Sequence, residues 1–142
     1  MKMKSDAFTL MELILVAVII VIIAATVAPL GAKTLEVGKW KAARATLQAI
    51  HSAEEEFCIH RGTYAALGAP GVANTIVGGR YIDDPNDPDQ RDWIYTATPA
   101  GVVTPGDCGT FTATAQRRAG RNASETVTID KNGDLGGTFD PN

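Results

Sequence analysis

The stretch that decides the fold is residues 7–30, AFTLMELILVAVIIVIIAATVAPL. No side chain from Leu13 to Ala32 is charged, and a helix of these 20 residues is about 30 Å long, the thickness of a bilayer's hydrocarbon core. A small domain cannot surround a helix that is apolar on every side, so we predict a membrane span. Glu12 lies beside this run, where a carboxylate costs up to about 2.5–3.5 kcal/mol, so it is expected to have a function and a partner.

The segment before this run is short and polar. Residues 1–7 read MKMKSDA and contain two lysines. A secretory signal peptide has an apolar run of about 7–15 residues that ends in a small-residue cleavage site. The run here is longer, and no A-x-A site ends it cleanly. An ordinary cleaved signal peptide is therefore not expected, and a plain signal anchor would not explain Glu12.

The order Ala-Phe-Thr-Leu-Met-Glu-Leu at residues 7–13, followed by the apolar run, resembles the prepilin signature of type IV pilins and type II secretion pseudopilins. In that family a basic leader is removed in front of the apolar run, and the new N-terminal residue, usually Phe, is N-methylated. Glu is fifth and Pro is often twenty-second in the mature chain. Counted from Phe8, Glu12 and Pro29 stand at these positions.

The resemblance implies cleavage between Ala7 and Phe8 by prepilin peptidase, and methylation of Phe8. It implies that Glu12 pairs with the α-amino group of Phe8 in a neighbouring subunit, and opposite charges attract strongly where water is scarce. Pro29 is expected to kink the helix. Two positions depart from the family, which usually has Gly in place of Ala7 and often Gly in place of Val21.

A second pattern extends the helix beyond Pro29. Apolar residues recur at spacings of three, four, three and seven, namely Trp40, Ala43, Leu47, Ile50 and Phe57. This periodicity predicts an amphipathic helix, and Gly62 is expected to end it as a C-cap. We therefore expect one long helix over residues 8–61.

Charges on this second half are unevenly distributed. Basic residues come early (Lys33, Lys39, Lys41, Arg44) and acidic residues come late (Glu54, Glu55, Glu56). The pattern fits a solvated surface, and it also fits head-to-tail attraction between stacked helices. Helical spacing also groups a candidate metal face (His51, Glu54, Glu55, Cys58), although no second ligand cluster accompanies it.

Strand patterns appear only in the C-terminal half. Residues 62–92 are rich in Gly, Pro and Asp and predict an irregular connector, with a short strand at Thr75–Val77. Four β-rich segments follow, at Trp93–Thr98, Gly109–Gln116, Glu125–Asp130 and Leu135–Phe139. Asn132-Gly133 predicts a hairpin turn before the last of them. An antiparallel sheet of three or four strands over residues 93–139 is expected to pack on the Trp40–Phe57 face.

Two further features concern bonds and ions. If this part of the chain lies outside the cytoplasm, Cys58 and Cys108 can form one disulfide, which would tie the helix to the sheet. Asp130, Asn132 and Asp134 resemble the start of a calcium loop. No glutamate follows at the twelfth position, so the chain has no EF-hand there and the hairpin is the preferred interpretation.

The expected fold is α+β and pilin-like: a leader (1–7), a transmembrane and filament-core half-helix (8–32) and a globular domain (33–142). The resemblance implies a non-enzymatic subunit, major or minor, of a type IV pilus. Its partners would be copies of itself, related pilins, prepilin peptidase and the inner-membrane assembly platform. The C-terminal domain would be periplasmic before assembly, and the filament an extracellular pilus or a periplasmic pseudopilus.

Two alternatives remain: a type II secretion pseudopilin and a membrane-anchored ligand-binding domain or enzyme. No Ser/His/Asp arrangement is visible, so no catalytic residue and no cofactor is assigned. The net charge of −3 suggests no nucleic-acid partner.

Overall fold

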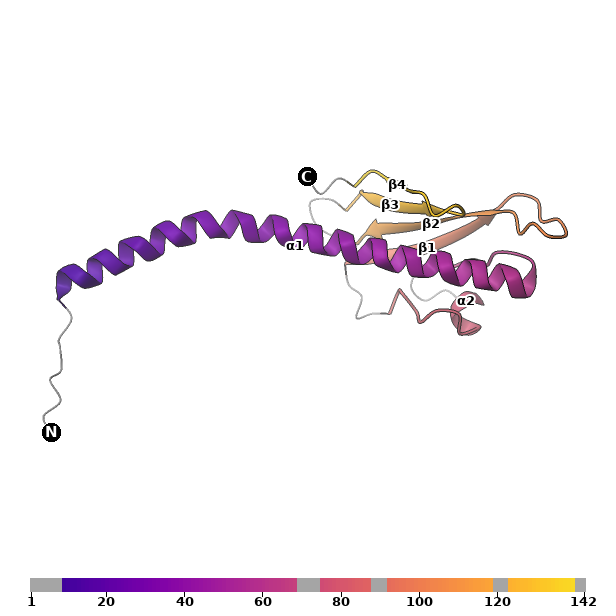
Figure 1. The fold of residues 1–142 in the computed structure, drawn as a ribbon, viewed down its shortest axis with the longest axis horizontal. Coiled ribbons are helices and arrows are strands. Elements are labelled where there is room, and N and C mark those ends of the chain that lie inside the picture. Colours follow the sequence, from indigo (N-terminus) through magenta and orange to yellow (C-terminus); the bar gives the residue numbers. More distant parts are fainter. Residues whose placement is uncertain (1–8, 69–74, 88–91, 119–122, 140–142) are drawn as a thin grey trace, which may run out of the picture. The chain divides into compact units, whose positions relative to one another are not determined.

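The computed structural model describes residues 9–68, 75–87, 92–118 and 123–139, without the side chains of residues 27–30, 32 and 33. The chain forms two compact units, Met1–Val37 and Gly38–Asn142. Helix α1, Leu10–Arg61, supplies residues to both units (Figure 1).

Both ends of α1 have identifiable capping interactions. At the start, Thr9 Oγ1 accepts a hydrogen bond from the Glu12 backbone N–H at 3.3 Å, as an N-cap does. At the end, Gly62 adopts a φ of +72° and its N–H donates to the Cys58 carbonyl at 2.7 Å. The predicted end at Gly62 is therefore confirmed, because glycine adopts this left-handed conformation without a steric penalty.

Two expectations concern the first half of α1, namely a membrane span and a kink at Pro29. Among the described residues, no helix is long and apolar enough to cross a membrane, so the transmembrane half predicted for residues 8–32 is not supported. The backbone is helical through position 29, and the kink at Pro29 stays a prediction.

Four antiparallel strands form one sheet in the order β1-β2-β3-β4. Their bounds are β1 Trp93–Ala100, β2 Thr110–Arg117, β3 Thr126–Asp130 and β4 Leu135–Gly137. The turn between β3 and β4 contains Gly133 with a φ of +82°. The predicted sheet and its last hairpin are thus confirmed.

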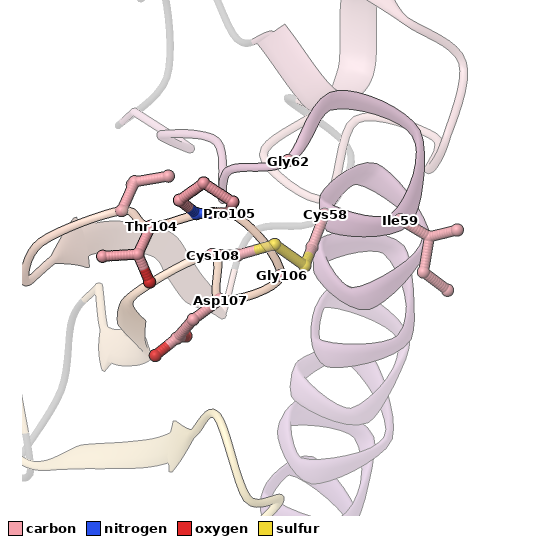
Figure 2. A pocket seen from close by; sticks show the side chains of 9 residues that line it. Cys58, Ile59, Gly62, Thr104, Pro105, Gly106, Asp107 and Cys108 are labelled. Carbon is pink, nitrogen blue, oxygen red and sulfur yellow. A yellow bond between two sulfur atoms is a disulfide. The ribbon is translucent and has the colours of Figure 1, made fainter.

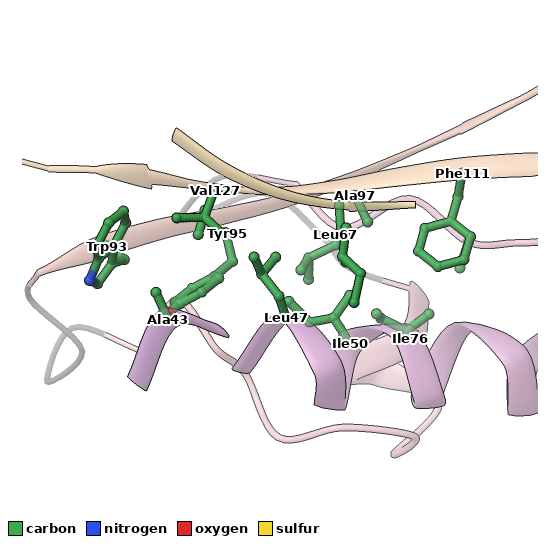
Figure 3. Close-up of a cluster of buried hydrophobic side chains, with 14 of the residues drawn as sticks. Ala43, Leu47, Ile50, Leu67, Ile76, Trp93, Tyr95, Ala97, Phe111 and Val127 are labelled. Atoms are coloured by element: carbon green, nitrogen blue, oxygen red, sulfur yellow. The ribbon is translucent and has the colours of Figure 1, made fainter. Parts of the chain in front are cut away.

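The core lies between the sheet and the second half of α1 (Figure 3). In β2, Phe111, Ala113 and Ala115 are buried while the residues between them are more exposed, which is the alternation that the sequence predicted. Leu47 and Ile50 from α1 are fully buried against this face. Burying one such side chain contributes about 1.5–3 kcal/mol, so this contact is the main stabilising layer of the unit.

One predicted element is wrong. Thr75–Val77 is not a strand, because Thr75–Gly78 forms the short helix α2. The Gly79 N–H donates to the Thr75 carbonyl at 2.9 Å, and this single turn places Ile76 in the core with no exposed surface. Tertiary burial of one isoleucine therefore outweighs the β-propensity of Thr-Ile-Val.

Candidate assembly surface

The first half of α1 carries an extended apolar surface. Twelve large apolar side chains between Leu10 and Ile23 are 44–78% exposed. They occupy nearly every position, so they point to all sides of the helix. Soluble monomers rarely expose apolar patches beyond a few hundred Å², so this surface needs a cover that the described part of the chain does not provide.

A shallow groove of about 340 Å³ lies on this surface, lined only by apolar side chains: Leu13, Ile14, Ala17, Val18, Val21 and Ile22. Val21, which stands where type IV pilins often have Gly, is 66% exposed there. The groove can accommodate the side chains of another apolar helix.

Glu12 is the acidic residue in the first turn of α1. Its side chain is exposed, and none of the described residues forms an ion pair with it. Ala7 and Phe8 lie outside the described residues, so the cleavage, the methylation and the Phe8–Glu12 pairing stay predictions.

The disulfide Cys58–Cys108 joins the last turns of α1 to the loop between β1 and β2 (Figure 2). The two Cα atoms are 5.9 Å apart, within the usual range for a disulfide. A pocket of about 560 Å³ lies beside this bond, lined by Cys58, Ile59, Gly62 and residues 103–108. The predicted tie between helix and sheet is therefore present, and it fixes the loop at the C-terminal end of α1.

The candidate metal face on α1 does not form. Cys58 is in the disulfide, and His51 Nε2 lies 3.1 Å from the Lys131 carbonyl oxygen. Glu54 accepts a hydrogen bond from Ala65. Over the part of the chain that the structure describes, no group of three or more His, Cys, Asp or Glu side chains is placed to hold a metal ion.

Asp130 closes the turn between β3 and β4. Its Oδ1 accepts hydrogen bonds from the backbone N–H groups of Asn132 and Asp134, each at 2.9 Å. These bonds, the one from Asp134 foremost, lower the pKa of the Asp130 carboxyl because they favour its charged form. The geometry is that of the hairpin that we preferred to a calcium loop.

Glu54 is a functional candidate. The sequence groups it with the charged residues on the surface of the helix, whereas in the structure it faces the core. The apolar stripe of α1 has a gap of seven between Ile50 and Phe57, and position 54 fills it at spacings of four and three. Glu54 is accordingly fully buried. The irregular spacing was the available signal, since a gap of seven in a three-four repeat leaves one core position unassigned.

Burial dominates the chemistry of Glu54. Its Oε2 accepts a hydrogen bond from the Ala65 N–H at 2.8 Å, while its Oε1 is buried without a hydrogen-bond partner. Loss of hydration raises the pKa of this carboxyl from 4.5 to about 7, and the Ala65 bond offsets part of the rise.

The remaining charges of α1 divide into paired and exposed groups. Lys39 Nζ forms an ion pair with Asp92 Oδ1 at 2.9 Å, and the Arg44 guanidinium lies 5.7 Å from the Trp40 ring centroid. The exposed surface of the helix keeps two basic residues early (Lys41, Arg44) and two acidic residues late (Glu55, Glu56). The side chain of Lys33 is not described.

Comparison with known proteins gives no match, whether with protein-family models, with curated proteins or with solved structures. A functional conclusion for this chain therefore depends on its residue order and on the surfaces described above.

Proposed function

We propose that the chain is a structural subunit, major or minor, of a type IV pilus, cleaved after Ala7 and polymerised through the first half of α1. The observation that carries the proposal is the apolar surface between Leu10 and Ile23, which none of the described residues covers. The residue order from Ala7 to Leu13, with Pro29 at its expected place, supports the same function.

The apolar surface requires two successive covers. Before assembly, lipid of the inner membrane surrounds residues 8–32, and the C-terminal unit lies in the periplasm. After assembly, the same side chains pack against helices of neighbouring copies. Each buried side chain contributes about 1.5–3 kcal/mol when removed from water, so neither state leaves this surface hydrated.

Glu12 gives the assembled state a specific register. Hydrolysis of the Ala7–Phe8 peptide bond by prepilin peptidase leaves a carboxylate on Ala7 and an amino group on Phe8. Methylation retains the positive charge of that amine. In the filament it pairs with Glu12 of a neighbouring copy, and a shifted register would leave both charges buried and unpaired, at a cost of several kcal/mol.

A type II secretion pseudopilin is the second candidate, because that group shares the N-terminal residue order. The major pseudopilin typically has a C-terminal calcium loop and no disulfide. This chain has the Cys58–Cys108 disulfide and closes its last hairpin with Asp130. These two features favour the pilus.

The proposal is tested by replacing Glu12. Glu12→Ala is expected to reach the membrane and to be processed normally, but to be nearly absent from sheared filaments, because the amine of Phe8 loses its partner. Asp83→Ala is the matched control, since it removes an exposed carboxylate from the connector. Immunoblots of the membrane and sheared fractions measure both variants. Wild-type incorporation of Glu12→Ala would refute the assembly role.

A further inference from the structure

A fully buried carboxylate on the core-facing side of α1 has to be explained. Glu54 follows Leu47 by seven residues, so it lies on the same side of α1 as the core. One of its oxygens has a single hydrogen-bond donor, the Ala65 N–H, and the other has none. Such a group is costly to bury when ionised, and much less costly when protonated.

The segment that Glu54 holds covers the edge of the sheet. Ala65 and Leu67 are 5% and 2% exposed. Leu67 and Ala97 of β1 exchange two backbone hydrogen bonds, of 3.0 and 2.9 Å. Because β1 is an outer strand, Leu67 occupies a part of the hydrogen-bonding edge that would otherwise be open to another strand.

We propose that Glu54 is a proton-operated latch, which in its neutral form holds residues 63–68 closed over the edge of β1 and in its ionised form releases them. Ionisation inside the core leaves a charge with one hydrogen bond and no counter-ion. Local opening exposes the ionised carboxylate of Glu54 to water. The latch is independent of the proposed filament function.

Titratable and aromatic groups from three parts of the fold lie near the latch. On the connector, the Tyr64 hydroxyl has its pKa raised, first by burial and then by the charges of Glu55, Asp107 and Glu54. The sheet contributes the uncharged ring of Phe111, 4.7 Å from the Tyr64 ring. On α1, His51 lies 3.9 Å from Glu55.

Glu54 itself forms no ion pair with any described residue. Asp107 comes from the loop between β1 and β2, so α1 and this loop both place acidic groups around Tyr64, which lies on the connector. For Glu54 itself, loss of hydration on burial is the dominant effect, and it favours the neutral carboxyl.

The direction of the pH effect follows from the two pKa values. The carboxyl has a pKa of about 7 when closed and an ordinary value of 4.5 when hydrated. The closed state is therefore fully favoured below pH 4.5 and loses this advantage as pH rises to 7. The opening constant should rise about tenfold per pH unit in that window, and about 300-fold in total.

Amide hydrogen exchange on the full chain in mild detergent tests the latch. Protection factors are followed for the amides of Leu67 and Ala97, with Ala113 in the central strand β2 as the internal reference. In the wild-type protein, the first two should be less protected than Ala113, which reports global unfolding, and they should fall up to about 300-fold between pH 4.5 and 7. Glu54→Gln, which retains an acceptor for Ala65, should remove this pH dependence, whereas Glu56→Gln, at an exposed position of the same helix, should keep it.

The latch is overturned if the protection of Leu67 and Ala97 in the wild type does not change with pH, or if Glu54→Gln keeps the dependence. It is also overturned if Leu67 and Ala97 are as strongly protected as Ala113 at every pH, because their exchange would then require global unfolding. A second measurement needs no variant: the carboxyl ¹³C shift of Glu54 should titrate near pH 7. Titration near 4.5 would contradict the latch.

Discussion

The side-chain amide of Asn86 bonds to both backbone groups of Tyr95. Asn86 Nδ2 donates to the Tyr95 carbonyl at 2.7 Å, and Asn86 Oδ1 accepts from the Tyr95 N–H at 2.8 Å. Nδ2 also donates to the Gly68 carbonyl at 3.0 Å. The side chain of one asparagine thus makes the hydrogen bonds to β1 that a neighbouring strand would make. It also holds the end of residues 63–68 in place.

Replacing this asparagine should therefore destabilise the C-terminal unit. Asn86→Ala leaves the buried N–H and carbonyl of Tyr95 without these partners, and each such group costs about 1–3 kcal/mol. We expect a loss of at least about 2 kcal/mol in the free energy of unfolding by urea. Asn132→Ala, in an exposed turn, is the control and should lose much less. Equal losses would mean that Asn86 does not carry the edge of β1.

The Cys58–Cys108 disulfide should contribute strongly to the same stability. The two residues are 50 positions apart, and closing a loop of that length lowers the entropy of the unfolded chain by an amount worth about 4 kcal/mol. Cys58→Ser with Cys108→Ser should therefore unfold at clearly lower urea concentration than the oxidised wild type. Reductant should shift the wild type to the same midpoint and leave the double variant unchanged. An insensitive wild type would show that the bond contributes little.

The exposed charges of α1 predict a rescue between two defective subunits. If the basic end (Lys41, Arg44) of one copy meets the acidic end (Glu55, Glu56) of the next, reversing either end alone places like charges together. Lys41→Glu with Arg44→Glu should lower the yield of sheared filaments severalfold, and so should Glu55→Lys with Glu56→Lys.

Combining the two reversals in one chain should restore the yield, because complementarity returns with opposite sign. Salt in the growth medium should weaken the defect of each single reversal, since exposed charges are screened. A fourfold-reversed chain that assembles as poorly as its parents would argue for the other interpretation, a solvated surface.

Most of the fold could be predicted because its signals are local. The strands alternate within themselves, as Phe111, Ala113 and Ala115 do, and Asn132-Gly133 marks its turn by residue type alone. The end of α1 at Gly62 is likewise set by one residue's conformational freedom. The disulfide could be predicted only on condition of an oxidising compartment, since spacing alone does not pair two cysteines.

The elements that could not be predicted depend on distant parts of the chain. Ile76 is helical because a single helical turn places its side chain in the core. The local sequence Thr-Ile-Val does not indicate that contact. Glu54 has the residue type of a surface position, and only the gap in the apolar stripe places it inside. From the sequence, Asn86 has the residue type of an ordinary loop position. Its role appears only in the fold, where it lies beside Tyr95.

The central claim is that residues 1–7 are removed and that the rest of the chain assembles. Mass spectrometry of the filament-associated protein tests it most directly. The account predicts an N-terminal peptide that begins at Phe8 and carries one additional methyl group. A filament-associated protein that retains residues 1–7 would contradict it.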